Sequence, residues 1–440
     1  MKKHIKLFVV LSILLVGSFS FYLFKGFKKD NIVYKDNKKN PLSGGIAMMF
    51  ETEAGSGNYE MTTRSEWPTE GYVFNENLSK CEKGSKLSWD NENKKVLMSG
   101  NKSDKCYVYF DVYVKLRFDQ SCNDNTLACH TAKLYTGTQG VNNIYYHDEN
   151  LINGAEDNSY RFAGANPNNY VCFGDDDATC PSDDLYRIIG VIDGKVKLIH
   201  ANGATTDMLG TNGEYAKTYG STSNYKGNGD LTKIGRYKWN KTGDNTWSTS
   251  VTNTVNLNKN FLTYLDGKNT KWKNMIADTT WYVGGMTYNN GSKSIAKTAY
   301  NYEVGANKDT STTAISKIGL MYVSDYGFAA APSAWTTILY NYDDATIKSK
   351  NWLYIGLYEW TLSRNSDVSG NAFGVYDGGY VSGDDVGNSI GYAVRPSFNL
   401  SSSIKFISGE GTAVNPIRIN LWLGDYACLS NASMVYAKKW

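Results

Sequence analysis

The chain reads EWTLSRNSD at 359–367, NAFGVYDGGYVS at 371–382 and GYAVRPSFNL at 391–400. Each piece is rich in β-branched and aromatic residues and is bounded by Asp, Asn, Gly or Ser, which is typical of half-buried strands separated by turns. The tripeptide Asp377-Gly378-Gly379 supplies the positive-φ positions that a hairpin turn needs. We therefore expect three antiparallel strands that form the core sheet of a C-terminal domain.

The composition of the whole chain predicts a folded, β-rich protein of the α+β class. Its 440 residues are 41% hydrophobic and 14% aromatic, which excludes general disorder. The 33 tyrosines and 42 glycines favour strands and loops over long helices. The length allows about two to four domains with a sizeable core.

The net charge of +3 is concentrated at the N-terminus, where residues 1–29 hold six lysines and no acid. Residues 31–440 carry 40 basic and 42 acidic side chains, a balance of −2. No basic field remains outside the N-terminus to attract phosphates, so we expect no nucleic acid among the partners.

The N-terminus is predicted to be a single membrane-spanning helix. Residues 7–24 are uncharged and lie between two groups of lysines. At about 1.5 Å per residue this run spans roughly 27 Å, close to the hydrocarbon thickness of a bilayer. The alternative is a cleaved signal peptide, with secretion after cleavage near Ser18. Because lysines flank both ends, the charge pattern leaves the orientation of this helix open.

The cysteines place the bulk of the chain outside the cytosol. Six of the seven fall into three local couples that bracket turn-rich sequence: Cys81 with Cys106, Cys122 with Cys129, and Cys172 with Cys180. No C-x-x-C spacing of a zinc site is present. We predict three disulfides and an extracytoplasmic location, the alternative being unpaired buried thiols. Cys428 is left over, either free or paired with one of the six.

The domain organisation is read from shifts in composition. We expect a membrane anchor or signal segment at 1–29, a polar linker at 30–44, a small β module at 45–114, a large mixed domain at 115–420 and a C-terminal extension at 421–440. The small module has a marginal core, so a disulfide between Cys81 and Cys106 would matter to its stability.

Several local predictions follow for the large domain. Strands at 186–192 and 195–199 should form a hairpin across Asp193-Gly194, and IKFISGEGTAVNPIRI at 404–419 should form another pair of strands. Short helices are expected within 126–135, 256–265 and 271–276. Residues 202–247, dominated by Gly, Asn, Thr and Tyr, are expected to form a long surface excursion.

Acidic residues gather in the loop closed by Cys172 and Cys180. Carboxylates are available from Asp175, Asp176, Asp177, Asp183 and Asp184. They could supply oxygen ligands for Ca²⁺, although they lack the order of an EF-hand loop. The alternative is a solvated acidic loop.

An ordered set of motifs resembles a C-terminal domain family of surface proteins from low-GC Gram-positive bacteria, a family that brings no biochemical role with it. The motifs are YRIIGVIDGKVKLI at 186–199, KIGLMYVSDYGF at 317–328, EWTLS at 359–363, AVRPSFNL at 393–400 and GEGTAVNPIRI at 409–419. The module at 45–114, with SEWPTEGY and SDKCYVYFD, resembles a companion found upstream in such proteins. More distantly, the resemblance implies the C-type-lectin-like fold shared with formylglycine-generating enzymes and phage tropism determinants.

The sequence offers little support for a catalytic site. Gly387–Gly391 fits G-x-S-x-G, but an Asp- and Gly-rich loop precedes the serine and strand-like sequence follows it, where a nucleophile elbow needs a strand and then a helix. Formylglycine generation needs a cysteine pair, and only Cys428 lies in the C-terminal half. Carboxylates for a glycosidase could come from Glu303, Asp325, Glu359, Asp384 or Asp385, at separations that the sequence leaves undefined.

We therefore expect a membrane-anchored, non-catalytic surface protein that binds a glycan or a protein. Loops rich in Tyr, Asn, Gly and Asp suit recognition, because tyrosine offers broad contact area at low rotamer cost. The candidate contact residues are Arg364, Asn365, Asp367, Tyr376, Asp377, Tyr380, Asp384 and Asp385. Ordinary turn chemistry could explain the same residues, and Arg395 is expected to be a structural ion-pair or carbonyl partner. The alternatives are an architectural envelope protein and a surface polysaccharide hydrolase.

Overall fold

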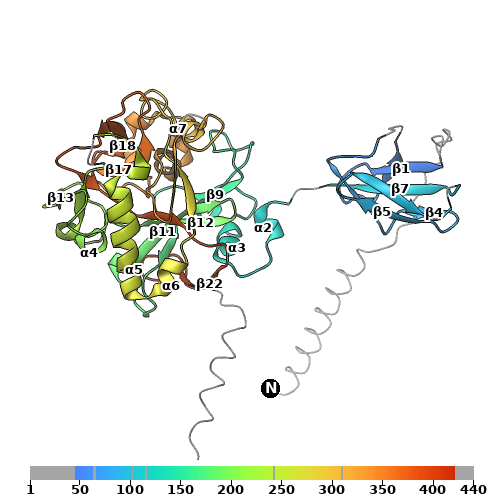
Figure 1. Cartoon of the computed structure of the whole chain (residues 1–440), viewed down its shortest axis with the longest axis horizontal. Helices are drawn as coiled ribbons and strands as arrows, with labels where there is room; N and C mark the ends of the chain where they lie inside the picture. Colours follow the sequence, from blue (N-terminus) through green and yellow to red (C-terminus); the bar gives the residue numbers. More distant parts are fainter. Residues whose placement is uncertain are drawn as a thin grey trace, which may run out of the picture. The chain divides into compact units, whose positions relative to one another are not determined.

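The computed structural model describes residues 45–62, 66–101, 103–113, 116–240, 243–308 and 311–421. The chain divides into two compact units, Met1–Leu116 and Arg117–Trp440 (Figure 1). The predicted membrane segment, the linker at 30–44, Cys428 and nearly all of the C-terminal extension lie outside the described residues. Within the described ranges, no helix is both long and apolar enough to cross a bilayer. The class is α+β and rich in β-structure, as predicted.

The small unit is a β-sheet covered on one face by a hairpin. The sheet runs β2 (Tyr59–Met61), β1 (Ile46–Glu51), β7 (Cys106–Val112) and β3 (Tyr72–Phe74), with β4 (Lys80–Cys81) also on β7, and the hairpin is β5 (Lys86–Asp90) and β6 (Lys95–Ser99). β1 and β7 are parallel, which places Met48, Phe50, Val108 and Phe110 in one buried cluster. Leu87, Trp89 and Val96 of the hairpin pack against it.

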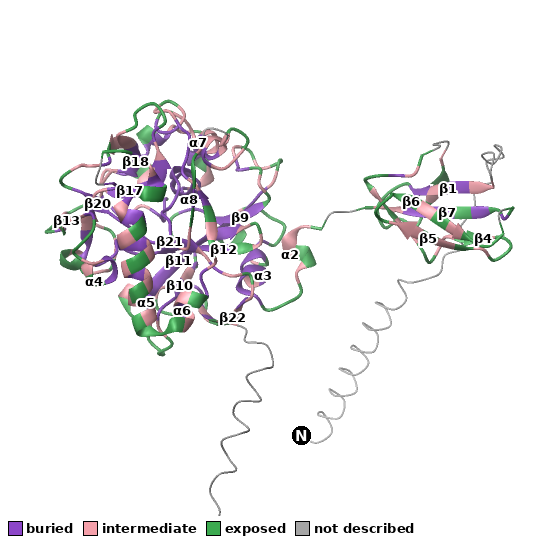
Figure 2. Ribbon diagram, viewed as in Figure 1, coloured by how far each residue is buried: buried purple, intermediate pink, exposed green. Residues whose placement is uncertain are grey.

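The first sheet of the large unit lies at its centre, and Figure 2 shows its strands buried. Its order is β21 (Ser397–Asn399), β12 (Lys195–His200), β11 (Leu185–Ile192), β9 (Ser159–Phe162) and β8 (Ile144–His147), with β10 (Tyr170–Cys172) also on β11. β11 and β12 form the predicted hairpin across Asp193-Gly194, with pairs from Tyr186–His200 to Ile192–Lys195 and a shift of register between Ile188 and Gly190. All but the last residue of β11 are buried, as expected for a strand covered on both faces.

The second sheet carries the hairpin predicted from Asp377-Gly378-Gly379. Its order is β13 (Tyr215–Thr218), β14 (Gly235–Tyr237), β20 (Tyr392–Ala393), β17 (Glu359–Arg364), β18 (Asn371–Val375) and β19 (Val381–Asp385). β17, β18 and β19 are antiparallel neighbours, as expected. Short two-stranded sheets complete the unit: β15 (Thr279–Tyr282) with β16 (Thr313–Ser316), and β22 (Ile404–Ser408) with β23 (Arg418–Leu421), the latter confirming the predicted C-terminal pair.

The prediction of one strand across residues 391–400 is wrong. β20 pairs with β17 in parallel, whereas β21 pairs with β12 of the first sheet, so the segment is shared between two sheets. The change of sheet falls at Arg395-Pro396, where proline lacks the N–H needed to continue a ladder. Arg395 is 1% exposed, and its guanidinium donates to the Glu359 carboxylate at 2.5 Å and to the Leu353 carbonyl at 2.9 Å. This confirms its predicted structural role.

The prediction of a surface excursion at 202–247 is also wrong. This segment supplies β13 and β14, and both Trp239 and Trp247 are fully buried. The Trp239 indole donates to the Thr361 carbonyl at 2.9 Å, which anchors the segment against β17. Two large aromatic residues therefore fold a stretch whose composition is typical of a loop.

Short helices surround the two sheets of the large unit. The α-helices are α2 (Phe118–Ser121), α3 (Leu127–Ala132), α4 (Thr206–Leu209), α5 (Leu262–Lys268), α6 (Thr270–Asn274), α7 (Ala296–Glu303), α8 (Val323–Ala329) and α9 (Ala345–Lys348). A π-helical segment, Thr252–Phe261, runs directly into α5, and 3₁₀ turns lie at Val141–Asn143, Ser182–Asp184, Leu231–Lys233, Trp247–Thr249, Pro332–Ala334 and Leu339–Asn341. The helices expected within 126–135, 256–265 and 271–276 are thus present.

Candidate functional site

The turn of the β18–β19 hairpin stacks two tyrosines on each other. The Tyr376 N–H donates to the Tyr380 carbonyl at 2.9 Å, and the Gly379 N–H donates to the Tyr376 carbonyl at 2.8 Å. The two phenol rings stack with centroids 4.7 Å apart and planes 24° apart. Gly379 has φ of 100°, a conformation that side chains other than glycine rarely adopt. The turn chemistry read from the sequence therefore fixes how the two rings lie.

Further tyrosines continue this stack in both directions. The ring of Tyr340, a residue beside the hairpin, has its centroid 5.5 Å from that of Tyr380. Tyr340 is 39% exposed. Tyr358 lies just before β17, and the centroid of its ring is 5.2 Å from those of both Tyr376 and Tyr392 of β20. We call Tyr340, Tyr380, Tyr376, Tyr358 and Tyr392 the tyrosine ladder.

The ladder is anchored in the core at its inner end and open at its outer end. Tyr392 is buried and stacks on Trp360, which is fully buried, with centroids 4.2 Å apart. Tyr376, Tyr380 and Tyr358 are partly exposed. The Lys293 ammonium lies 3.5 Å from the centre of the Tyr340 ring, a cation–π contact at the outer end. The rings are therefore held in fixed orientations before any ligand arrives.

Four phenols of the ladder have raised pKa values, which keeps them neutral at physiological pH. Burial, together with the neighbouring tyrosines, raises the pKa of Tyr380 to about 12. Burial also raises the pKa of Tyr376 and Tyr358. Burial and a hydrogen bond to the Asp384 carboxylate raise the pKa of Tyr392. These four residues thus present uncharged aromatic faces and hydroxyl groups.

Two of the predicted aspartates flank the ladder. Asp384 accepts hydrogen bonds from the Tyr392 hydroxyl and, at 2.8 Å, from the Asn388 amide. The Asp377 carboxylate accepts from the Asn224 amide at 3.2 Å, and its carbonyl accepts from the Tyr354 hydroxyl at 2.7 Å. Carboxylate and amide groups are thus available beside flat apolar rings.

The other predicted contact residues lie, like Asp384, at the end of the hairpin away from its turn. Arg364 ends β17 opposite Ala372, and Asp385 ends β19 opposite Asn371. The Asn365 side chain accepts from the Asp367 N–H at 2.9 Å, and the Asp385 carboxylate accepts from the Gly387 N–H at 2.6 Å. Asn365 and Asp385 therefore have the turn roles that were the alternative explanation, whereas Tyr376, Asp377, Tyr380 and Asp384 are brought to the ladder.

Residues missed by the sequence reasoning make up much of the site. Tyr340, Tyr358 and Tyr392 come from three separate segments, and Lys293 comes from a fourth. Each was one tyrosine among 33 or one lysine among many. The abundance of tyrosine was the only signal in the sequence, because the meeting of these rings depends on long-range pairing that no local pattern encodes.

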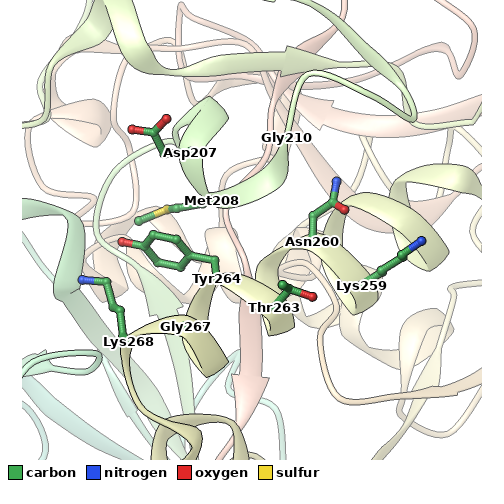
Figure 3. A pocket seen from close by; sticks show the side chains of 9 residues that line it. All are labelled: Asp207, Met208, Gly210, Lys259, Asn260, Thr263, Tyr264, Gly267 and Lys268. Carbon is green, nitrogen blue, oxygen red and sulfur yellow. The ribbon is translucent and has the colours of Figure 1, made fainter.

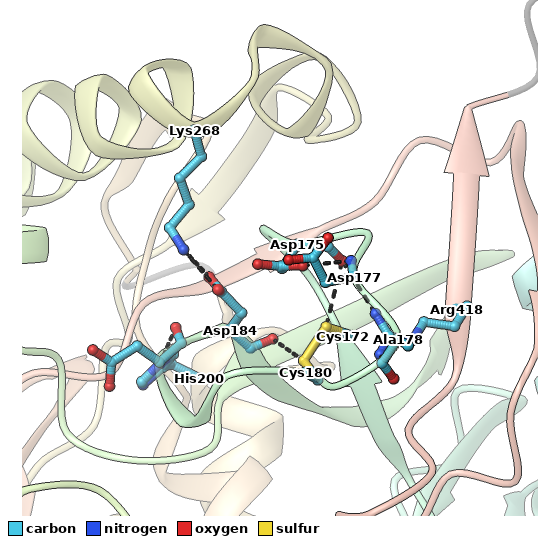
Figure 4. The surroundings of a disulfide bond; sticks show 10 residues. Cys172, Asp175, Asp177, Ala178, Cys180, Asp184, His200, Lys268 and Arg418 are labelled. Atoms are coloured by element: carbon cyan, nitrogen blue, oxygen red, sulfur yellow. Dashed lines mark hydrogen bonds and ion pairs between the residues drawn. A yellow bond between two sulfur atoms is a disulfide. The ribbon is translucent and has the colours of Figure 1, made fainter.

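The three predicted disulfides are confirmed. They join Cys81 to Cys106, Cys122 to Cys129 and Cys172 to Cys180. The first links residues that face each other on β4 and β7 of the small unit. The third closes the acidic loop, as Figure 4 shows.

Basic side chains surround the acidic loop, as Figure 4 shows for Lys268 and Arg418. Lys271 pairs with the Asp176 carboxylate, and Lys268 pairs with Asp184 at 2.6 Å. Arg418 donates to the carbonyls of Asp175 at 3.3 Å and Ala178 at 2.9 Å. In the described part of the chain, no three acidic, His or Cys side chains are grouped so that they could hold a metal ion. Calcium binding by Asp175, Asp176, Asp177 and Asp183 stays an untested prediction.

A shallow depression of about 620 Å³ lies between α4 and the helix that ends in α5 (Figure 3). Asp207, Met208, Lys259 and Tyr264 are among its lining residues. Lys268 at its rim is bound to the buried Asp184 carboxylate. The Asn260 amide donates to the Leu209 carbonyl at 2.7 Å. Two polar side chains of this depression, Lys268 and Asn260, are thus committed to the fold.

The residues considered for catalysis are mostly buried. Glu303, Asp325 and Glu359 are each at most 2% exposed and are engaged by neighbouring donors. Ser389 of the G-x-S-x-G match lies in a turn that leads into β20, without the helix that a nucleophile elbow requires. The ladder is the best-formed open feature among those that the sequence singled out.

No protein-family model, no curated protein and no solved structure matches the chain.

Proposed function

We propose that this chain is a membrane-anchored, extracytoplasmic binding protein whose tyrosine ladder holds a glycan without chemical turnover. The observation that carries the proposal is the ordered stack from Trp360 outward to Tyr340, flanked by Asp377 and Asp384. Pyranose rings combine an apolar C–H face with hydroxyl groups at the rim. Such ligands match flat aromatic faces with carboxylate and amide acceptors beside them.

The ladder has physical properties that suit weak, repeated contacts of this kind. The negative face of each ring attracts polarised C–H groups, and tyrosine loses little rotamer entropy on binding. The rings are already fixed by Gly379 and by the buried Trp360, so little conformational entropy is lost when a ligand binds. Neutral phenols also avoid repelling an acidic polysaccharide.

The proposed location rests on the cysteines. Three disulfides in the described residues support an oxidising compartment. The uncharged run at 7–24, which would supply the anchor, lies outside the described residues. Secretion after cleavage near Ser18 would leave the binding function unchanged.

We further propose that the large unit has a C-type-lectin-like fold, as the resemblance implies. The motifs that carry the resemblance supply β21, most of β11, β12, β17 and α8, and parts of β20 and β23, and many of their residues are buried. They would therefore specify a shared scaffold, while the ladder residues Tyr340, Tyr376 and Tyr380 lie between them and set the ligand of this chain.

A glycan array tests the proposal directly. The full chain, with its disulfides intact, should bind a subset of bacterial or host polysaccharides. The Tyr380→Ala variant should lose about tenfold in affinity, since an aromatic contact of this kind is worth roughly 1–2 kcal/mol. Tyr113→Ala, an exposed tyrosine of the small unit, is the matched control and should bind normally.

Other outcomes would redirect the proposal. A folded chain that binds no glycan but binds a cell-surface protein would point to protein adhesion. A folded chain that binds neither would favour an architectural envelope role. Cleavage of a bound polysaccharide that stops on replacing one carboxylate would indicate a hydrolase.

A further inference from the structure

A buried ionic cluster joins the first sheet to α8. The Lys197 ammonium of β12 lies 2.5 Å from Asp325 Oδ2, and Arg161 Nη1 of β9 lies 3.2 Å from Asp325 Oδ1. The side chains are 4%, 1% and 3% exposed, respectively. The Tyr322 N–H also donates to Asp325 Oδ2 at 2.8 Å. A primary amine and a carboxyl group are thus held in contact and away from bulk water.

The surroundings of Lys197 favour its uncharged amine form. The Lys197 ammonium lies 4.3 Å from the centre of the Tyr322 ring and 5.6 Å from that of Trp281. Burial lowers the pKa of Lys197, although Asp325 opposes the shift. Glu303 lies in the same region, and burial raises its pKa to about 7, so below that pH it adds little negative charge that would hold the proton on Lys197.

We propose that Lys197 and Asp325 condense to form an intramolecular amide between Nζ and Cγ. The proton first passes from Nζ to Oδ2 along their hydrogen bond, which gives a neutral amine and a neutral acid. The Nζ lone pair then attacks Cγ, and Arg161 stabilises the negative charge that develops on Oδ1. A second proton then passes from Nζ to the Oδ2 hydroxyl, which departs as water, so that the C–N bond replaces the bond from Cγ to Oδ2.

Two physical effects drive this condensation. Holding the groups in contact corresponds to effective molarities of about 10⁵–10⁸ M, which offsets the tendency of amides to hydrolyse in water. The reaction also removes two opposite charges whose burial is costly. Arg161 keeps a charge partner, because it also pairs with Asp157 at 2.8 Å.

The bond would link parts of the fold that are far apart in the sequence. β12 belongs to the first sheet, whereas α8 packs against both β9 and the strands β17 and β18 of the second sheet. The amide would therefore tie the first sheet covalently to α8, which packs against the second sheet. The inference is independent of what the tyrosine ladder binds.

Peptide mapping of the full chain tests the proposal. After unfolding and reduction, trypsin cannot cleave at an acylated lysine, so residues 196–217 should stay linked to residues 318–348. The linked species should be lighter than the sum of the two peptides by one water. Recovery of cleavage after Lys197, together with a free 318–348 peptide, from natively folded protein would overturn the proposal.

Two variants separate the chemistry from folding. Asp325→Asn should release ammonia instead of water and give a product of the same mass as the wild type, because both reactions end in the same amide. Lys197→Arg keeps the positive charge beside Asp325 but removes the nucleophilic amine, so it should show no linked peptide. A linked peptide in Lys197→Arg would assign the bond to other residues and contradict the proposal.

Discussion

Arg395 and Glu359 form a buried ion pair, 2.5 Å apart, where the chain passes from the second sheet to the first. Both side chains are at most 2% exposed. The Arg395 guanidinium also binds the Leu353 carbonyl, so it connects β17, β20 and the segment before β17. The pair fixes the start of the strand that precedes the hairpin, and through it the position of the ladder.

Arg395→Met should lower the free energy of unfolding by about 3–5 kcal/mol, because it leaves the Glu359 carboxylate buried without its partner. Urea denaturation of the two proteins measures this difference. Lys273→Met is the matched control, since the Lys273–Asp266 pair is about one-third exposed and should contribute less than about 1 kcal/mol. Equal losses in both variants would contradict a special role for Arg395.

Glu303 should make the stability of the large unit depend on pH. Burial raises its pKa from 4.5 to about 7, so the folded state binds a proton more tightly than the unfolded state. The corresponding stability is fully present below about pH 4.5 and is lost as the pH rises to about 7. The loss is at most about 3–4 kcal/mol, since each pKa unit corresponds to about 1.4 kcal/mol.

Glu303→Gln tests this, because glutamine stays neutral throughout. The free energy of unfolding, measured in urea from pH 5 to pH 8, should fall less steeply in the variant than in the wild type. The slope is the readout, whatever the variant does to overall stability. Parallel curves would show that Glu303 does not change its proton affinity on folding.

Gly379→Ala should disturb the ladder through the backbone. Its φ of 100° is unfavourable for alanine, and an added Cβ would lie 2.8 Å from Lys348 Cγ and 3.0 Å from the Tyr342 carbonyl oxygen. We expect a loss of about 1–3 kcal/mol in stability and weaker glycan binding. Gly378→Ala is the control, since its nearest neighbour would lie 3.4 Å away. Thermal unfolding of both variants makes the comparison, and identical melting temperatures would contradict this account.

Removal of the Cys172–Cys180 disulfide should loosen the acidic loop. The bridge closes a loop across a separation of 8 residues, which corresponds to about 2–3 kcal/mol in the chain-entropy account. The double replacement Cys172→Ala with Cys180→Ala should lower the unfolding midpoint accordingly. Thiol labelling of the native wild type should find none of the six paired cysteines reactive. A reactive thiol at any of them would contradict the disulfide assignment.

Local chemistry made the hairpins and disulfides predictable. Asp193-Gly194 and Asp377-Gly378-Gly379 each specify a turn between strands that are neighbours in the sequence. The paired cysteines are likewise close in sequence. The division of 391–400 between two sheets was not predictable, because it depends on pairing with β12 and β17.

Contacts between distant segments of the chain were equally unpredictable at the site. Tyr376 and Tyr380 could be predicted because one turn holds both of them. Tyr340 and Tyr392 reach them only through tertiary packing. Trp239 and Trp247 were missed because Gly and Asn dominate the composition around them, although two tryptophans are enough to anchor that segment in the core.

The most direct test of the central claim is calorimetric titration of a glycan identified on the array against Tyr380 variants. If the ring face carries the binding, Tyr380→Phe should bind within about threefold of the wild type, and Tyr380→Ala should bind about tenfold or more weakly. Unchanged affinity in Tyr380→Ala, with a native circular dichroism spectrum, would contradict glycan recognition by the tyrosine ladder.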